Sequence, residues 1–180
     1  VVGGVRRSAL ISLSNLSDER MRHAKTGQWW DTEGQRALAN NSAVYNETPE
    51  MGIFMQEWQS LYESKSGERG VFSRAASIAQ AGKNGRRDIE WEFGTNPCSE
   101  IILRSREFCN LSEIVVRAGD TEESLKRKVR LATILGTIQS TLTNFRFVST
   151  AWRKNCEEER LLGVSMTGIM DCRLTNGDTG

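Results

Sequence analysis

The stretch Ile114-Val115-Val116-Arg117 and the residues that follow it carry the clearest structural signals in the sequence. Its β-branched residues favour a strand. Asp120 and Glu123 then mark the start of a helix, which we expect to end near Asn144. Apolar residues recur along this helix and predict one buried stripe: Leu125, Val129, Ala132, Leu135, Ile138 and Leu142. Residues 162–168, Leu-Gly-Val-Ser-Met-Thr-Gly, predict a buried strand whose glycines allow close backbone approach.

Outward from this segment, strand signals continue to alternate with helix signals. Further strands are expected at residues 9–13 and 42–45. Further helices are expected over residues 17–27, 49–64, 73–82 and 152–160. Strands that alternate with long amphipathic helices indicate an α/β fold, as part of a barrel or of a large sheet.

Aromatic residues within these elements suggest where the core lies. Trp29 and Trp30 are expected in the core or in the wall of a pocket, because no basic pattern of a nucleic-acid surface surrounds them. Phe54, Trp58, Leu61 and Tyr62 recur at helical spacing, which indicates core packing. The pair Asn40-Asn41 could bind a polar ligand, but a turn is the more usual setting for two asparagines.

Composition limits the class of protein. The sequence has 180 residues, 38% hydrophobic and 26% charged, which suits one domain with a real core spanning residues 1–180. Lys and Arg number 24 against 23 Asp and Glu, so we predict neither a nucleic-acid nor a membrane partner. No apolar run reaches the roughly 18 residues of a membrane helix, and no signal peptide is evident, so we expect a cytoplasmic protein. The first residue is Val1 and the end is polar, which suggests part of a longer chain.

The four cysteines are Cys98, Cys109, Cys156 and Cys172, and no two form a Cys-x-x-Cys pair. The single histidine, His23, is distant in sequence from all of them. We therefore predict no metal site. In a cytosolic protein such thiols are more often buried or catalytic than paired in structural disulfides.

The segment Asn96-Pro97-Cys98-Ser99-Glu100 is the strongest candidate for chemistry. Pro97 forbids a helix interior and biases the residue before it toward an extended conformation. In an extended segment Asn96, Cys98 and Glu100 would point the same way. One face would then offer an amide, a thiol and a carboxylate, which could bind and react with a small polyol.

Two further segments could join this site. A turn near Ser105 could bring Cys109 close to Cys98, although the spacing does not require it. Near the start of the chain, Arg6 and Arg7 follow Gly3-Gly4. They could bind a phosphate or stack on a base, or they could be solvated charges at a flexible end.

The candidate segments also resemble a known family. Asn96 to Ile101, followed by Phe108-Cys109-Asn110-Leu111, resembles the catalytic finger loop of ribonucleotide reductases. The similarity is closest to the monomeric, adenosylcobalamin-dependent ribonucleoside-triphosphate reductases. Further matching stretches are residues 3–9, 39–45 and 159–168. The resemblance implies a central part of the ten-stranded α/β barrel of these enzymes.

The resemblance implies a role for each candidate residue. Cys98 would become the thiyl radical that abstracts the ribose 3′-hydrogen, Glu100 would be the general base on the 3′-hydroxyl, and Asn96 would hydrogen-bond the ribose. Cys109 would be one of two thiols that reduce the 2′-position and end as a disulfide. The specificity loop, which links an effector to base choice, would comprise Gly4, Arg6, Arg7 and Ser8.

The family also implies partners. They are a ribonucleoside triphosphate substrate, a deoxynucleotide effector, adenosylcobalamin and a thioredoxin-like reductant, in an enzyme that is monomeric at full length. In the family the partner thiol of Cys109 lies upstream of this sequence, so the stretch alone should not turn over. Cys156 and Cys172 match no family motif and are interpreted as incidental thiols. Two alternatives stay open: the large subunit of a two-subunit ribonucleoside-diphosphate reductase, and a non-enzymatic nucleotide-binding scaffold.

Overall fold

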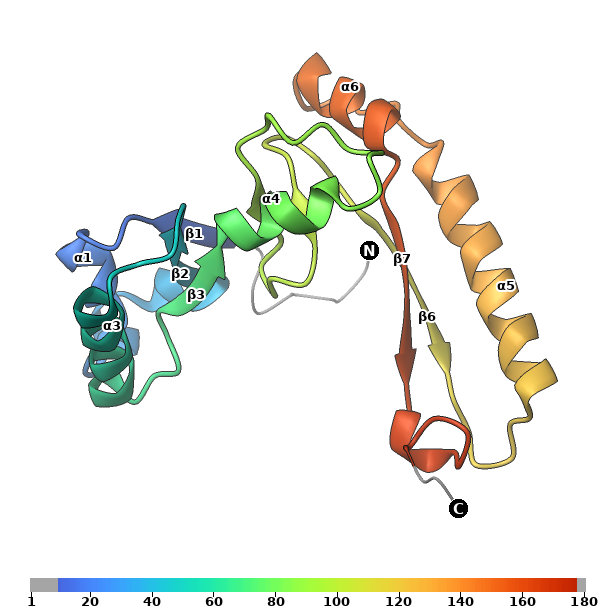
Figure 1. Ribbon diagram of the computed structural model, residues 1–180, viewed down its shortest axis with the longest axis horizontal. Coiled ribbons are helices and arrows are strands. Elements are labelled where there is room, and N and C mark those ends of the chain that lie inside the picture. The colour runs from blue at the N-terminus through green and yellow to red at the C-terminus, as the bar shows by residue number, and fades with distance from the viewer. Residues whose placement is uncertain (1–9, 178–180) are drawn as a thin grey trace. The chain divides into compact units, whose positions relative to one another are not determined.

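The computed structural model describes residues 10–177, and the chain divides between Ser105 and Arg106 into two units of mixed helix and strand (Figure 1). This composition confirms the predicted α/β class. The predicted specificity-loop residues Gly4, Arg6, Arg7 and Ser8 lie outside the described residues. Each unit is described by itself below, and the assignment of residues 1–180 to one partial barrel domain stays a prediction.

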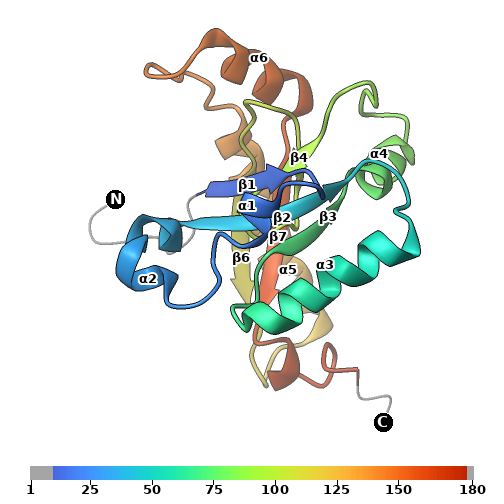
Figure 2. The same ribbon diagram turned by 90° about the vertical axis from the view of Figure 1, so that its left-hand side faces the viewer.

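A three-stranded parallel sheet forms the centre of the first unit (Figure 2). Its order is β1 (Leu10–Ser14), β2 (Ala39–Tyr45) and β3 (Gly70–Ser73). The β1–β2 connection holds α1 (Glu19–Arg22), α2 (Trp29–Thr32) and the 3₁₀ helix η1 (Gly34–Leu38). The β2–β3 connection holds α3 (Met51–Ser64). Helical connections are what parallel strands require, because a short hairpin cannot join them.

Local signals account for several of these boundaries. The Asp18 carboxylate accepts a hydrogen bond from the Met21 N–H at 3.0 Å and so caps α1. The Ser73 hydroxyl accepts one from the Ala76 N–H at 3.1 Å and caps α4 (Arg74–Gly82). The expected helices over 49–64 and 73–82 are confirmed.

The turn expected at Asn40-Asn41 is wrong, because both residues lie in β2. They pair with Ile11 and Ser12 of β1. Pairing with a neighbouring strand overrides the local preference of asparagine for turns.

A short antiparallel hairpin completes the first unit. Its strands are β4 (Gly94–Thr95) and β5 (Ile102–Leu103), with Gly94 opposite Leu103. Phe93, directly before β4, is fully buried and fixes the base of the hairpin in the core. Residues 96–101 therefore form the loop at the tip.

The second unit is a strand–helix–strand arrangement. The parallel strands β6 (Asn110–Val115) and β7 (Leu162–Thr167) pair along their full lengths. Between them in sequence come α5 (Glu122–Ser140) and α6 (Thr150–Glu159), and η2 (Ile169–Asp171) follows β7. Figure 1 shows α5 running alongside both strands.

The predicted stripe on α5 is only partly correct. Ala132, Gly136 and Ser140 are the buried residues of α5, whereas Leu135 and Ile138 are 59% and 57% exposed. A Cβ built on Gly136 would already be in ordinary van der Waals contact with the Leu162 side chain, at 3.6 Å, so a row of small residues lets the helix approach the sheet closely. The helix also ends at Ser140, earlier than the expected end near Asn144.

Three further burial predictions are wrong in whole or in part within the described residues. Trp30 is 56% exposed, and Trp58 and Tyr62 on α3 are 49% and 80% exposed. The buried residue of α3 is the charged Glu57. Strand β7 is mostly exposed rather than buried. Among residues 10–177, no helix is both long and apolar enough to span a membrane.

Candidate active site

The Asn96–Glu100 segment forms a turn at the tip of the β4–β5 hairpin. The Ser99 N–H donates to the Asn96 carbonyl at 2.9 Å, and Ser99 has a φ of 66°. The prediction of an extended segment with three side chains on one face is therefore wrong. Proline is as well suited to the second position of such a turn as to a strand, and only the two residues on each side of the loop pair as strands.

The turn puts the thiol at its apex. Pro97 and Cys98 are its two central residues, and the side chains of Cys98 and Glu100 are both exposed. A nucleophilic or radical thiol has to be accessible to its reaction partner. Within the first unit, both proposed reacting groups meet this requirement.

The Asn96 side chain fixes the shape of the loop. Its Oδ1 accepts a hydrogen bond from the Ile101 N–H at 3.1 Å and one from the Thr95 hydroxyl at 3.3 Å. The amide oxygen thus spans the loop from its first residue to its last. Asn96 is half-buried, as a residue that organises the loop from inside should be.

A second asparagine anchors the loop to the sheet. The Asn40 side-chain amide on β2 donates to the Pro97 carbonyl. The next residue, Asn41, donates its side-chain amide to the Met21 carbonyl at 2.6 Å and its backbone N–H to Glu68 at 3.1 Å. The sequence allows a polar-ligand site at this asparagine pair but does not indicate that Asn40 anchors the loop.

A cavity of about 460 Å³ borders the same strand of the first unit. Its volume lies in the range of small-molecule pockets. It is lined by Ser12, Asp18, Arg20, Met21, Ala24, Lys25, Arg36, Ala39, Asn40 and Asn41. Asn40 therefore both lines a cavity and holds the loop that carries Cys98.

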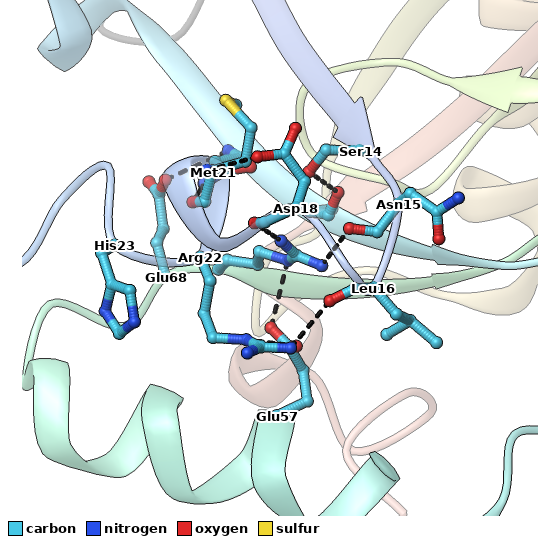
Figure 3. Close-up of polar contacts among 12 residues, drawn as sticks. Ser14, Asn15, Leu16, Asp18, Met21, Arg22, His23, Glu57 and Glu68 are labelled. Carbon is cyan, nitrogen blue, oxygen red and sulfur yellow. Dashed lines mark hydrogen bonds and ion pairs between the residues drawn. The ribbon is translucent and has the colours of Figure 1, made fainter.

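A buried ionic network supports this sheet (Figure 3). Glu57 of α3 is 3% exposed and lies 3.2 Å from Arg22 Nε and 3.1 Å from Arg69 Nε. Arg22 also donates to the Leu16 carbonyl at 2.7 Å, and Arg69 donates to the Asn15 carbonyl at 2.8 Å. One carboxylate thus connects α3 to the segment after β1 and to the start of β3.

The network perturbs the ionisable groups inside it. Burial lowers the pKa of the Arg69 guanidinium, and the Glu57 carboxylate opposes that shift. Burial also raises the pKa of the Tyr45 hydroxyl, and the charge of Glu57 adds to the rise. Close by, Lys25 pairs with Glu68 at 2.9 Å. The sequence pattern indicated none of these partners.

Cys109 belongs to the second unit and directly precedes β6. It is half-buried. Cys98 belongs to the first unit, so the predicted approach of the two thiols stays a prediction. Among residues 10–177, no cluster of His, Cys, Asp and Glu could hold a metal ion.

The two remaining cysteines are buried. Burial raises the pKa of the Cys156 thiol, which keeps it protonated and unreactive at neutral pH. Its Sγ accepts a hydrogen bond from the Phe108 N–H at 3.3 Å. Cys172 is 1% exposed and donates to the Asp120 carbonyl at 3.7 Å.

An exposed thiol and a carboxylate on an anchored hairpin loop, within an α/β framework, are features compatible with thiol-based enzymes. Comparison with known proteins is more specific. The chain is 33% identical over 177 residues to the adenosylcobalamin-dependent ribonucleoside-triphosphate reductase of Lacticaseibacillus paracasei, an alignment that covers 95% of this chain and 22% of that protein. It is 30% identical over 189 residues to the enzyme of the same name from Lactobacillus gasseri, an alignment that covers 95% of this chain and 22% of that enzyme.

A third relative, from Lactobacillus delbrueckii subsp. bulgaricus, has the same name and is 28% identical over 193 residues, covering 97% of this chain and 23% of the relative. The chain therefore spans about a fifth of the length of these relatives. Its resemblance to adenosylcobalamin-dependent ribonucleoside-triphosphate reductases is confirmed over nearly its whole length. No family model matches the chain, and no solved structure matches it.

Proposed function

We propose that this chain is part of an adenosylcobalamin-dependent ribonucleoside-triphosphate reductase and carries the reacting residues of its active site. The enzyme would convert ribonucleoside triphosphates to 2′-deoxyribonucleoside triphosphates for DNA synthesis. The observation that supports this most strongly is the exposed Cys98 on an anchored hairpin loop, in a chain that aligns with these reductases over 95% of its length. In the complete protein, residues 1–180 would contribute to the ten-stranded barrel, with residues 96–101 as its finger loop.

The loop geometry suggests a separate catalytic role for each of three residues. Cys98, as a thiyl radical at the apex, would abstract the ribose 3′-hydrogen, and Glu100 would take the proton of the 3′-hydroxyl. Asn96 Oδ1 already accepts from Ile101 and Thr95. Its Nδ2 is therefore the atom that would donate to a ribose hydroxyl.

Cys109 would supply reducing equivalents at the 2′-position. The 2′-hydroxyl leaves as water and hydrogen takes its place, while Cys109 and a second thiol elsewhere in the complete protein lose two electrons and two protons and form a disulfide. A thioredoxin-like dithiol would then reduce that disulfide for the next cycle. Effector binding would act through Gly4, Arg6, Arg7 and Ser8.

The cofactor would supply the radical that Cys98 carries. An exposed thiol at the tip of a loop is accessible for hydrogen-atom transfer to a radical source, and Cys98 is such a thiol.

The test is turnover of the full-length protein with ribonucleoside triphosphate, adenosylcobalamin and a dithiol, and no second subunit. Cys98→Ser should abolish deoxynucleotide formation and preserve nucleotide binding. Cys109→Ser should allow radical formation but block multiple turnovers. The control is Cys172→Ser, because Cys172 is a buried thiol, 1% exposed, that takes no part in the proposed chemistry.

Normal turnover by Cys98→Ser would refute the proposal. Undiminished multiple turnover by Cys109→Ser would refute its redox role alone. A wild-type protein that is inactive under these conditions would favour the two-subunit diphosphate reductase.

A further inference from the structure

We infer that α6 positions Cys109 for its redox partner, through Trp152 and Cys156. This inference rests on the redox role proposed for Cys109. Nothing in the chain's resemblance to the reductases assigns a role to Cys156, and the sequence alone predicts an incidental thiol. The hydrogen bonds that Cys156 makes to the residue before Cys109 favour a positioning role instead.

The residue before Cys109 is held by one face of α6. Trp152 and Cys156 are four residues apart, so both face the same way. The Trp152 ring stacks on the Phe108 ring with centroids 4.4 Å apart and an interplanar angle of 25°. Phe145 meets the same ring edge-on at 5.2 Å. The side chain of Phe108 therefore contacts two aromatic rings.

Cys156 fixes the backbone of the same residue. Its thiol accepts from the Phe108 N–H at 3.3 Å and donates to the Phe108 carbonyl at 3.9 Å. Cys156 is 6% exposed, so water cannot readily replace these hydrogen bonds. The Phe108 carbonyl is part of the peptide bond that joins Phe108 to Cys109.

The residue after Cys109 is fixed by the segment that leaves α6. Asn110 donates both its backbone N–H, at 3.1 Å, and its side-chain amide, at 3.0 Å, to the Leu161 carbonyl. Between α6 and Leu161, Arg160 donates to the Ser140 carbonyl at 2.9 Å, which secures this exit to the end of α5.

Both neighbours of Cys109 are thus hydrogen-bonded to α6 or to Leu161, which follows it, so this helix determines the position of the thiol. Disulfide formation needs Cα atoms within about 7 Å and a narrow range of geometries. A displacement of the Cys109 backbone would slow formation of the disulfide without changing substrate binding. Cys156 and Trp152 are therefore positioning residues.

The experiment uses the full-length protein and compares Cys156→Ala, Cys156→Ser and Trp152→Leu. The first readout is the rate at which iodoacetamide alkylates Cys109, mapped by mass spectrometry with Cys98 as internal reference. The second is the multiple-turnover rate and the KM for the triphosphate. Lys154→Ala is the matched control, because Lys154 is on the same helix and its side chain is 74% exposed.

Cys156→Ala should change the alkylation rate of Cys109 by about threefold or more, because the exposure and surroundings of a thiol set its reactivity. It should lower multiple turnover by about tenfold at unchanged KM, since small misplacements of reacting groups are costly. Cys156→Ser should restore part of both, because a hydroxyl can still accept from the Phe108 N–H, whereas the Phe108 carbonyl, 3.9 Å from the sulfur, is too far for a hydroxyl to reach. Trp152→Leu should act as Cys156→Ala does, without altering a thiol.

Wild-type alkylation of Cys109 in both Cys156→Ala and Trp152→Leu would overturn the inference. If Cys156→Ala fails to fold, the alkylation rate of Cys109 in Trp152→Leu alone tests the inference. The redox role fails separately, if Cys109→Ser sustains multiple turnover. In that case altered alkylation would still demonstrate positioning by α6, but without a role in this reaction.

Discussion

Glu57→Gln is the sharpest test of what holds the first unit together. The substitution keeps the size of the side chain but removes the charge that pairs with Arg22 and Arg69. The Arg69 side chain is 1% exposed and Glu57 is 3% exposed, so solvent cannot screen the two guanidinium groups that remain. Removing one partner of a buried ion pair costs about 3–5 kcal/mol. Because an amide oxygen can still accept from one arginine, we expect the lower value, about 3 kcal/mol.

This magnitude sets the size of the effect on local opening. Since every 1.4 kcal/mol is about a factor of ten, amides of β2, β3 and α3 should exchange with solvent about 100-fold faster in Glu57→Gln. The measurement is native-state hydrogen exchange by mass spectrometry on the full-length protein. Glu19→Gln is the control, because Glu19 pairs with the same Arg22 but is 65% exposed. Glu19→Gln should change the free energy of local opening by no more than about 1 kcal/mol.

If both variants exchange like the wild type, the network contributes nothing to stability and the reasoning fails. If both accelerate exchange equally, burial does not distinguish the two carboxylates, which would also contradict the argument.

Two further predictions concern the second unit. Gly168→Ala should destabilise the end of β7 by more than the roughly 1–2 kcal/mol of a left-handed non-glycine residue. Its φ is +73°, and a Cβ there would lie 2.4 Å from the Val116 carbonyl oxygen. Gly177→Ala, with a φ of +81° and nothing within 4 Å, is the control, and equal losses of amide protection would contradict the steric argument. For Asp120, hydrogen bonds from Lys128, from the Ser124 hydroxyl and from the Arg117 N–H lower the carboxyl pKa from 3.8 to about 2. The carboxylate therefore stabilises the start of α5 above about pH 4, and this contribution is lost as pH falls from 3.8 toward 2. Amide hydrogen exchange at the first turn of α5, followed as the pH is lowered, should show that loss in the wild type and not in Asp120→Asn.

Local signals predicted the position of most helices, and the reason is physical. Ser73 caps the first turn of α4, and Pro49 lies directly before Glu50, the N-cap of α3, so the sequence near each boundary is sufficient. Which face of a helix is buried depends on partners that are distant in sequence. Glu57 is the buried residue of α3 because Arg22 and Arg69 meet it, 35 positions before and 12 positions after it in the chain. No periodicity of α3 itself encodes those partners.

The same distinction explains the error on α5. Hydrophobic spacing correctly predicted a helix, but small residues rather than large ones pack against the sheet. A helix can approach two paired strands closely only where its own side chains are short. Gly136 and Ala132 meet that condition, whereas Leu135 and Ile138 do not. Side-chain volume decided the buried face here, and hydrophobicity alone could not predict it.

The candidate site shows how a predicted set of residues can take a geometry that the sequence did not indicate. Alternation along a strand placed Asn96, Cys98 and Glu100 on one face, but the segment turns after Asn96. The turn gives the same residues different tasks. Asn96 organises the loop from inside, Asn40 holds it to the sheet, and Cys98 is left exposed at the apex. A thiol that must be accessible and also well placed needs such support from polar side chains, because an exposed loop has few apolar contacts to fix it.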